Sequence, residues 1–264
     1  MPRRARPHRL RRRRQDHEGA WLFLDGSPHP WFGPHHESVC LLLATDDATG
    51  KPLWGTFQPH ENRDGCFEVC WHVFRRFGLN GLWYLDRASQ FKTTRHGGLH
   101  AAQRLDQDDT PFQKAMDRLA IGVQFAHSPQ ARGRGERING SFQGRLVAEL
   151  MHEGITDCPA ATRYLNRTFI PRYAKRFGRE PADPVPAWRP VPEGLDLRTV
   201  LCVCHPRTVS GDNTISLDGI TYQLQPPQGR NHLVHTVVEV QQWFDKSVHC
   251  VHPRYGRIRL KPIS

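Results

Sequence analysis

The sequence has no long hydrophobic run. Its longest uninterrupted apolar stretch is Val39–Ala44, whereas a membrane-spanning helix needs roughly 20 such residues. The basic N-terminal segment is not followed by the apolar stretch of a secretory signal. The sequence therefore excludes a transmembrane helix of ordinary length, and we expect a cytoplasmic protein with no membrane partner.

Zinc-type cysteine spacing is also missing. The seven cysteines include no CxxC pair, and no HExxH motif occurs among the 16 histidines. Two loose groups remain, namely Cys66, Cys70 and His72, and Cys202, Cys204 and His205. Neither group has the ligand spacing of a structural zinc site. We expect free, mostly buried thiols in a reducing compartment.

Acidic residues are absent from the first 14 positions, which hold eight arginines. Residues 15–184 are balanced, with 20 basic and 20 acidic side chains, and residues 185–264 carry nine basic and six acidic ones. The net charge of +11 is therefore mostly a property of the N-terminus. Because guanidinium groups match phosphate geometry, this segment indicates a polyanionic partner such as nucleic acid. A solvated tail is the alternative, and we expect residues 1–19 to form a disordered arm.

Hydrophobic periodicity predicts an α/β domain over residues 20–180. Three strands are followed by alternating helices and strands, which is the order of an RNase H-like mixed five-stranded sheet flanked by helices. The expected strands are 21–25, 39–45, 52–58, 81–85 and 122–126. The expected helices are 62–77, 110–119, 131–152 and 160–177, the last interrupted by Pro171.

A second domain is predicted after a proline-rich linker. Residues 181–194 hold five prolines, a composition typical of a boundary between domains. Residues 195–264 then alternate short apolar runs with Gly, Asp and Asn turns. This pattern favours a small all-β barrel, with strands near 200–203, 214–217, 220–224, 233–240, 247–251 and 257–260.

Three carboxylates stand where an α/β fold places its chemistry. Asp25 and Asp86 each follow an apolar run that we expect to end there, and Glu136 lies near the start of the long amphipathic helix. If the two strands are neighbours, both Asp side chains leave one sheet edge, and the helix can bring in Glu136. Clustered carboxylates suit divalent metals, and two such ions support phosphodiester transfer. Acids at strand ends are also often merely solvated.

Four segments carry a resemblance to a known family. They are Leu24–Phe32 (LDGSPHPWF), Thr45–Gly50 (TDDATG), Tyr84–Phe91 (YLDRASQF) and Ala126–Gln143 (AHSPQARGRGERINGSFQ). Together they resemble the integrase catalytic core of DDE transposases, and more narrowly the ISNCY-type bacterial insertion-sequence transposases. The resemblance covers about residues 15–260 and includes the linker and the barrel.

The resemblance implies an Asp25, Asp86 and Glu136 triad that binds two Mg²⁺ ions, for which Mn²⁺ can substitute. It implies hydrolysis at DNA 3′-ends and strand transfer into target DNA, by a nucleoid-associated bacterial enzyme that assembles as a homo-oligomer on transposon ends. Asp46 and Asp47 belong to the second motif, and turn capping is their simpler role. The barrel resembles the family's DNA-binding appendage. The residues expected to contact DNA are Arg132, Arg134, Arg137, Asn139, Gln143, Arg163, Arg167, Arg172, Lys175 and Arg176.

One departure from the family concerns the N-terminus. Members carry a helix-turn-helix region that recognises transposon ends, and only 24 residues precede Asp25 here. We therefore expect that region to be lacking. Two other functions remain open: a non-catalytic DNA-binding remnant of a transposase, and an RNase H-like nuclease.

Overall fold

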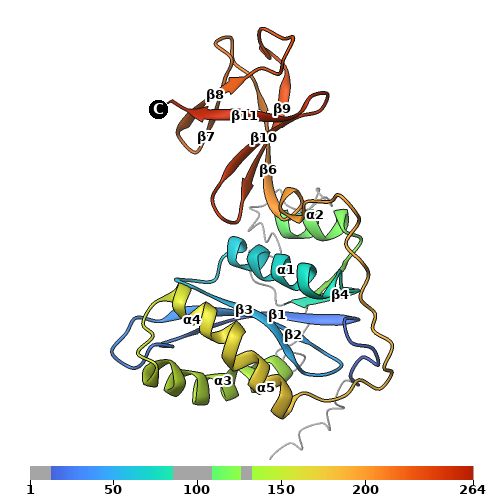
Figure 1. Ribbon diagram of the computed structural model, residues 1–264, viewed down its shortest axis with the longest axis vertical. Helices are drawn as coiled ribbons and strands as arrows, with labels where there is room; N and C mark the ends of the chain where they lie inside the picture. The colour runs from blue at the N-terminus through green and yellow to red at the C-terminus, as the bar shows by residue number, and fades with distance from the viewer. Residues whose placement is uncertain (1–12, 86–108, 126–132, 264) are drawn as a thin grey trace, which may run out of the picture.

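The computed structural model describes residues 13–85, 109–125 and 133–263, without the side chains of residues 133–137. A five-stranded sheet in the order β3-β2-β1-β4-β5 forms its first part (Figure 1). The strands are β1 (Trp21–His29), β2 (Val39–Asp46), β3 (Pro52–Gln58), β4 (Leu82–Leu85) and β5 (Gly122–Phe125).

Strand directions confirm the RNase H-like architecture. β1, β2 and β3 form an antiparallel meander, while β4 runs parallel to β1 and β5 parallel to β4. β4 and β5 are reached through helices, as parallel strands require. The sheet is thus mixed, with β1 at its centre.

The first strand is longer than predicted, so Asp25 lies within it and not at its end. β1 continues through Gly26 and Pro28 to His29, which pairs with Val39 of β2. Proline has no N–H to donate, but in the described part of the chain this half of β1 pairs only with β2. A proline on such a one-sided stretch is tolerated.

Helices cover both faces of the sheet (Figure 1). α1 (Arg63–Phe77) and α2 (Pro111–Arg118) pack on one face, in the cluster that contains Leu22 and Leu24. α3 (Gly133–His152), α4 (Cys158–Tyr164), a π-turn η3 (Leu165–Phe169) and α5 (Ile170–Phe177) pack on the other. The predicted helix starts at residues 62 and 110 are confirmed, since Asn62 caps α1 and a Thr110–Gln113 capping box starts α2. Pro171 lies in the first turn of α5, where a proline does not break a helix.

The edge strand β3 is covered by side chains from α4 and η3. Asn166 Oδ1 accepts from the Gly55 N–H at 3.1 Å, and its Nδ2 donates to the Gly55 carbonyl at 2.7 Å. The Phe57 N–H donates to Thr162 Oγ1 at 3.0 Å. Asn166 is buried and takes the place of a neighbouring strand at this point. Such cover removes backbone groups that could otherwise pair with another chain.

The C-terminal part is the predicted six-stranded antiparallel barrel, nearly closed, in the order β6-β9-β10-β11-β8-β7. Its strands are β6 (Cys202–Thr208), β7 (Thr214–Leu217), β8 (Ile220–Gln225), β9 (Val237–Trp243), β10 (Val248–His252) and β11 (Gly256–Pro262), with a 3₁₀ turn η4 (Leu197–Thr199) before them. It stands beyond α1 and α2 (Figure 1). Phe244 packs against Trp71 of α1 with ring centroids 5.9 Å apart.

The proline-rich linker and the described part of the N-terminal segment both lie against the core. In the proline-rich stretch, Trp188 stacks on Phe77 at 5.5 Å and Arg189 pairs with Leu79. In the N-terminal segment, the described residues 13–19 are held by the β2–β3 turn, since the Gly19 N–H donates to Asp46 at 2.9 Å. The order of residues 13–19 corrects the expectation of a disordered arm up to residue 19, and residues 1–12 lie outside the described residues.

We predict that Asn166→Ala destabilises the protein by about 2–4 kcal/mol, because it leaves both Gly55 backbone groups without their partner at a buried edge. Urea unfolding followed by tryptophan fluorescence measures this. Arg167→Ala, at the exposed neighbouring position, is the matched control and is expected to change stability by less than about 0.5 kcal/mol. Equal losses in the two variants would contradict the role given to Asn166.

Candidate active site

Asp25 lies on the sheet face that α3 covers. Side chains alternate along β1, so Leu22 and Leu24 point into the α1 cluster and Phe23, Asp25 and Ser27 point to the other side. Asp25 is half-buried, and Asn139 Nδ2 of α3 donates to its Oδ2 at 3.0 Å. The carboxylate is thus oriented by a side chain of the helix that lies over its strand.

A second contact fixes the register between α3 and β1. Gln143 Nε2 donates to Ser27 Oγ at 3.1 Å. Four helical residues rise about 6 Å and two strand residues about 6.6 Å. The Asn139–Gln143 pair therefore matches the Asp25–Ser27 pair, and helix and strand run alongside each other in the same direction. Both helix residues were predicted to contact DNA, and in the structure they contact β1.

The other two predicted acids are only partly described. β4 ends at Leu85, so Asp86, the next residue, lies outside the described residues. Glu136 belongs to α3, one turn before Asn139, but its side chain is not described. Within the described part of the chain, no three potential metal ligands come together.

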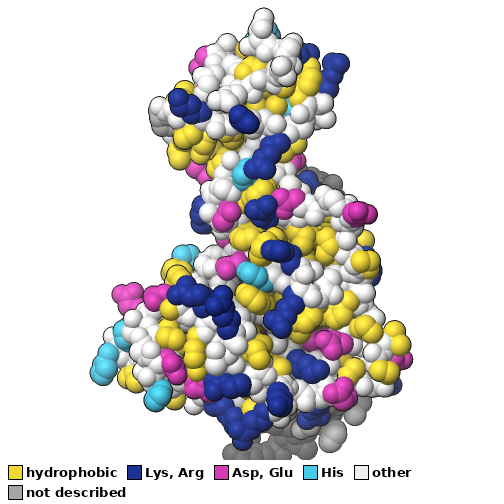
Figure 2. Space-filling view, viewed as in Figure 1, with side chains coloured by type: hydrophobic (Ala, Val, Ile, Leu, Met, Phe, Trp, Pro, Cys, Tyr) yellow, Lys and Arg dark blue, Asp and Glu magenta, His cyan; other side chains and the backbone are white. Residues whose placement is uncertain are grey.

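The predicted DNA-contacting cations divide into two groups. Arg132 lies outside the described residues, and for Arg134 and Arg137 only the helical backbone is described. The other five are exposed along α4, η3 and α5: Arg163, Arg167, Arg172, Lys175 and Arg176. Figure 2 shows Lys and Arg side chains gathered over this side of the molecule. The exposed cations form a surface that can meet phosphates.

One further cation on this surface was not predicted. Arg145 of α3 lies over the Phe177 ring at 4.7 Å, and Arg176 lies over the same ring at 5.3 Å. Arg172, in contrast, is an ion-pair partner of Glu149. Arg145 lies within the predicted helix, two residues after Gln143. Only the packing of α5 on α3 brings it close to the predicted cations of α5.

Asp46 has the structural role that turn capping predicts. Its Oδ2 accepts from the Thr49 N–H and from Thr49 Oγ1, both at 2.7 Å, and its Oδ1 accepts from Gly19. Burial raises its pKa. The neighbouring Asp47 accepts from the Gln15 N–H at 2.8 Å. These two carboxylates stabilise the β2–β3 turn.

The seven cysteines are free thiols, as expected. His72, from the first Cys/His group, stacks on Trp54 at 3.9 Å, and burial lowers its pKa to about 4. In the second group, Cys202 Sγ and Cys204 Sγ lie 3.7 Å apart. The hydrogen bond with Cys202 lowers the pKa of Cys204.

Two known proteins are similar to this chain in amino-acid sequence. The chain is 32% identical over 239 residues to the y4bF protein of Sinorhizobium fredii, named as a candidate transposase, covering 90% of this chain and 51% of that protein. It is 30% identical over 179 residues to the transposase for insertion sequence IS1202 of Streptococcus pneumoniae, covering 68% of this chain and 37% of that one. The chain is therefore homologous to part of each of these two transposase sequences.

This transposase homologue spans about half the length of the first relative and less of the second. No family model matches it. Among solved structures, a chain of the simian T-cell lymphotropic virus intasome aligns at a TM-score of 0.47 and 15% identity, covering 100% of this chain and 85% of that one. In the described residues, no helix is long and apolar enough to span a membrane.

We predict that Asn139→Asp makes the stability of the protein depend on pH. The new carboxylate replaces a hydrogen-bonding amide 3.0 Å from Asp25, and two like charges so close raise the pKa of one of them above its unfolded value. The native state then binds the extra proton, so the variant loses stability as the pH rises from about 5 to 8. The expected loss relative to wild type is on the order of 1–2 kcal/mol at pH 8.

Thermal unfolding at the two pH values measures this loss, and added Mn²⁺ should reverse it by binding between the carboxylates. Gln143→Glu is the matched control, because its neighbour Ser27 is uncharged. A stability difference that does not change with pH would contradict the proximity of Asn139 to Asp25.

Proposed function

We propose that this chain is the catalytic region of a transposase, and that Asp25, Asp86 and Glu136 form its metal-binding triad. The observation that carries the proposal is the contact of Asn139 with Asp25. Residues three apart share a face of a helix, so Glu136 and Asn139 belong to the same face of α3. The contact of Asn139 with Asp25 aligns this face with β1. Glu136 lies about 4.5 Å from Asn139 along the helix axis.

The strand register supports including Asp86. β1 and β4 are parallel, with Phe23 opposite Tyr84. Counting two residues onward along both strands gives Asp25 and Asp86. In sequence, Asp86 is therefore as far beyond Tyr84 as Asp25 is beyond Phe23, which supports taking both as ligands of the same ions.

The donor set fits a hard divalent cation. All three proposed ligands are carboxylates, and the neighbouring groups on β1 and α3 are the hydroxyl of Ser27 and the amides of Asn139 and Gln143. Mg²⁺ prefers oxygen ligands, and Mn²⁺ accepts the same set. When bound, two such ions would activate the attacking oxygen and stabilise the leaving oxygen.

The chain's own residues would position the DNA. The Asn139 amide orients the Asp25 carboxylate, and the exposed cations of α3, α4 and α5 hold phosphates on either side. In the first reaction, a water oxygen bonds to phosphorus, the P–O3′ bond breaks and the 3′-oxygen gains a proton. In the second, this 3′-hydroxyl attacks a target phosphodiester and releases a target 3′-hydroxyl. One P–O bond forms for each that breaks, so no external energy source is required.

We predict that strand transfer depends on this triad. The assay uses Mn²⁺, a plasmid target and duplexes from the ends of the element that encodes the chain, already cut to expose the 3′-hydroxyl. Wild type is expected to join ends, while Asp25→Asn, Asp86→Asn and Glu136→Gln each lose at least about 100-fold in rate, since each removes a charged ligand. Asp117→Asn, at an exposed position on α2, is the matched control and should join like wild type.

Three outcomes would contradict the proposal. Full joining by Asp25→Asn would show that this carboxylate is not used. DNA binding by wild type without joining or cleavage would favour a DNA-binding remnant. Cleavage without joining would favour a nuclease.

A further inference from the structure

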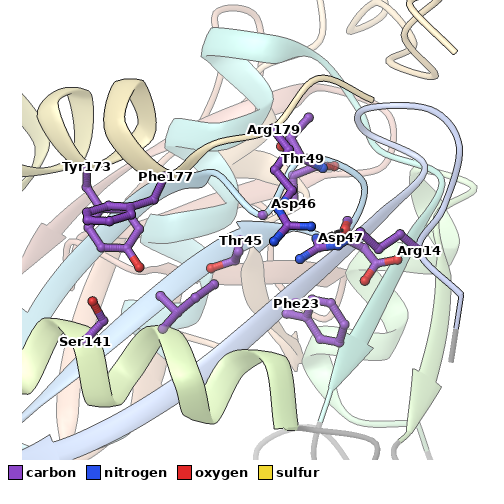
Figure 3. Close-up of a pocket in the computed structure, with 12 residues that line it drawn as sticks. Arg14, Phe23, Thr45, Asp46, Asp47, Thr49, Ser141, Tyr173, Phe177 and Arg179 are labelled. Atoms are coloured by element: carbon purple, nitrogen blue, oxygen red, sulfur yellow. Dashed lines mark hydrogen bonds between the residues drawn. The ribbon is translucent and has the colours of Figure 1, made fainter. Parts of the chain in front are cut away.

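A cavity of about 300 Å³ opens beside the candidate active site, on the same face of the sheet (Figure 3). Phe23 and Thr45 form its floor, and Ile138 and Ser141 of α3 form one wall. Phe23 precedes Asp25 by two residues on that face, so the cavity begins about 7 Å from the carboxylate. The proposed chemistry does not use this space.

The cavity has two chemically different ends. At one end, Tyr173 and Phe177 of α5 present aromatic rings whose centroids lie 4.8 Å apart. At the other end lie Arg14, Arg179 and the β2–β3 turn with Asp47, as Figure 3 shows. A ligand that fits must offer a flat apolar face and a polar edge.

The charges at the polar end argue against an isolated phosphate. Two guanidinium groups there are matched by the carboxylates of Asp46 and Asp47, so the end carries donors and acceptors without a net charge. The Asp46 carboxylate already accepts hydrogen bonds from Gly19 and Thr49. Arg179 is exposed, and in the described part of the chain its guanidinium has no hydrogen-bond or ion-pair partner. A neutral heterocycle with both donors and acceptors on its edge suits this end better than an anion.

Cations continue outside the aromatic end. Arg145 and Arg176 both lie over Phe177. They also line a smaller adjoining hollow, together with the ion pair of Arg172 and Glu149. Such cations match the phosphates on either side of a bound nucleotide. This continuity favours a base that belongs to a strand over a free nucleotide.

We propose that the cavity receives one unpaired nucleobase of the DNA strand bound at Asp25. The ring stacks at the Tyr173–Phe177 end, its edge meets the polar end, and Arg145 and Arg176 bind the neighbouring phosphates. Bases removed from the duplex stack on aromatic side chains in this way. This inference rests on the proposed function, because it takes the substrate to be DNA held at Asp25.

The test compares two duplexes that differ at one position. One ends in a single unpaired thymine, and the other carries an abasic sugar there. Binding is measured by fluorescence anisotropy in EDTA, so no cleavage occurs. Wild type is expected to prefer the thymine duplex by about tenfold, within the range that stacking of one base supplies. Equal affinities, or no DNA binding, would overturn the proposal.

A variant whose new side chain fills the cavity gives the decisive comparison. Ser141→Phe places a ring in the space and should abolish the preference while leaving the affinity for a blunt duplex unchanged. Ala148→Phe adds the same ring at an exposed position of α3 and should keep the preference. A preference that survives in Ser141→Phe, with thermal unfolding showing that both variants fold, would place the base elsewhere and overturn the proposal.

Two further measurements distinguish the base site from the proposed catalysis and from a site for free nucleotides. Asp25→Asn should keep the thymine preference although it loses strand transfer, so a failure of the proposed catalysis is distinguishable from a failure of the base site. Thymidine monophosphate should compete at least 100-fold more weakly than the thymine duplex. Equal competition would mean a free-nucleotide site and would overturn the assignment to a DNA strand.

Discussion

The alignment of α3 with β1 is the constraint on which the site depends. Two amide side chains one helical turn apart reach two β1 side chains, Asp25 and Ser27, that are spaced by nearly the same distance along the strand. A helix shifted by one residue would present a different face to the strand, because each residue turns the helix by 100°. Both the proposed triad and the cavity therefore depend on this one register.

Packing contacts outside the two amide hydrogen bonds also hold α3 in this register. Phe142 and Leu146 of α3 are fully buried against α5 and β2, so the helix is held by apolar contacts as well as by its amides. Asn166 closes the β3 edge from η3, which joins α4 to α5. The π-turn adds one residue to the helical turn that carries Asn166.

Much of this fold could be predicted from the sequence. The helix starts at Asn62 and Thr110, the alternation in the strands and the six barrel strands are local signals, and all are confirmed. The end of β1 was predicted too early, because Gly26 and Pro28 usually end a strand, and only the pairing with β2 carries it further. Asn166 could not be found, since its partner Gly55 is 111 residues away in the sequence.

Three residues of the candidate site that were selected from the sequence can be compared with the structure. Asp25, Asn139 and Gln143 were selected from sequence, and the structure brings them to one place, although the two amides contact β1 directly. The cavity was not foreseen, because Phe23, Ile138 and Tyr173 have the pattern of core residues. Their arrangement around a space depends on three elements meeting.

The most direct measurement is a crystal structure with Mn²⁺, using anomalous scattering to locate the ions. The account predicts anomalous peaks between Asp25 and the N-terminal half of α3, with the carboxylates of Asp86 and Glu136 as the other ligands. No peak there at saturating Mn²⁺, or peaks held by other residues with Asp86 and Glu136 pointing away, would contradict it.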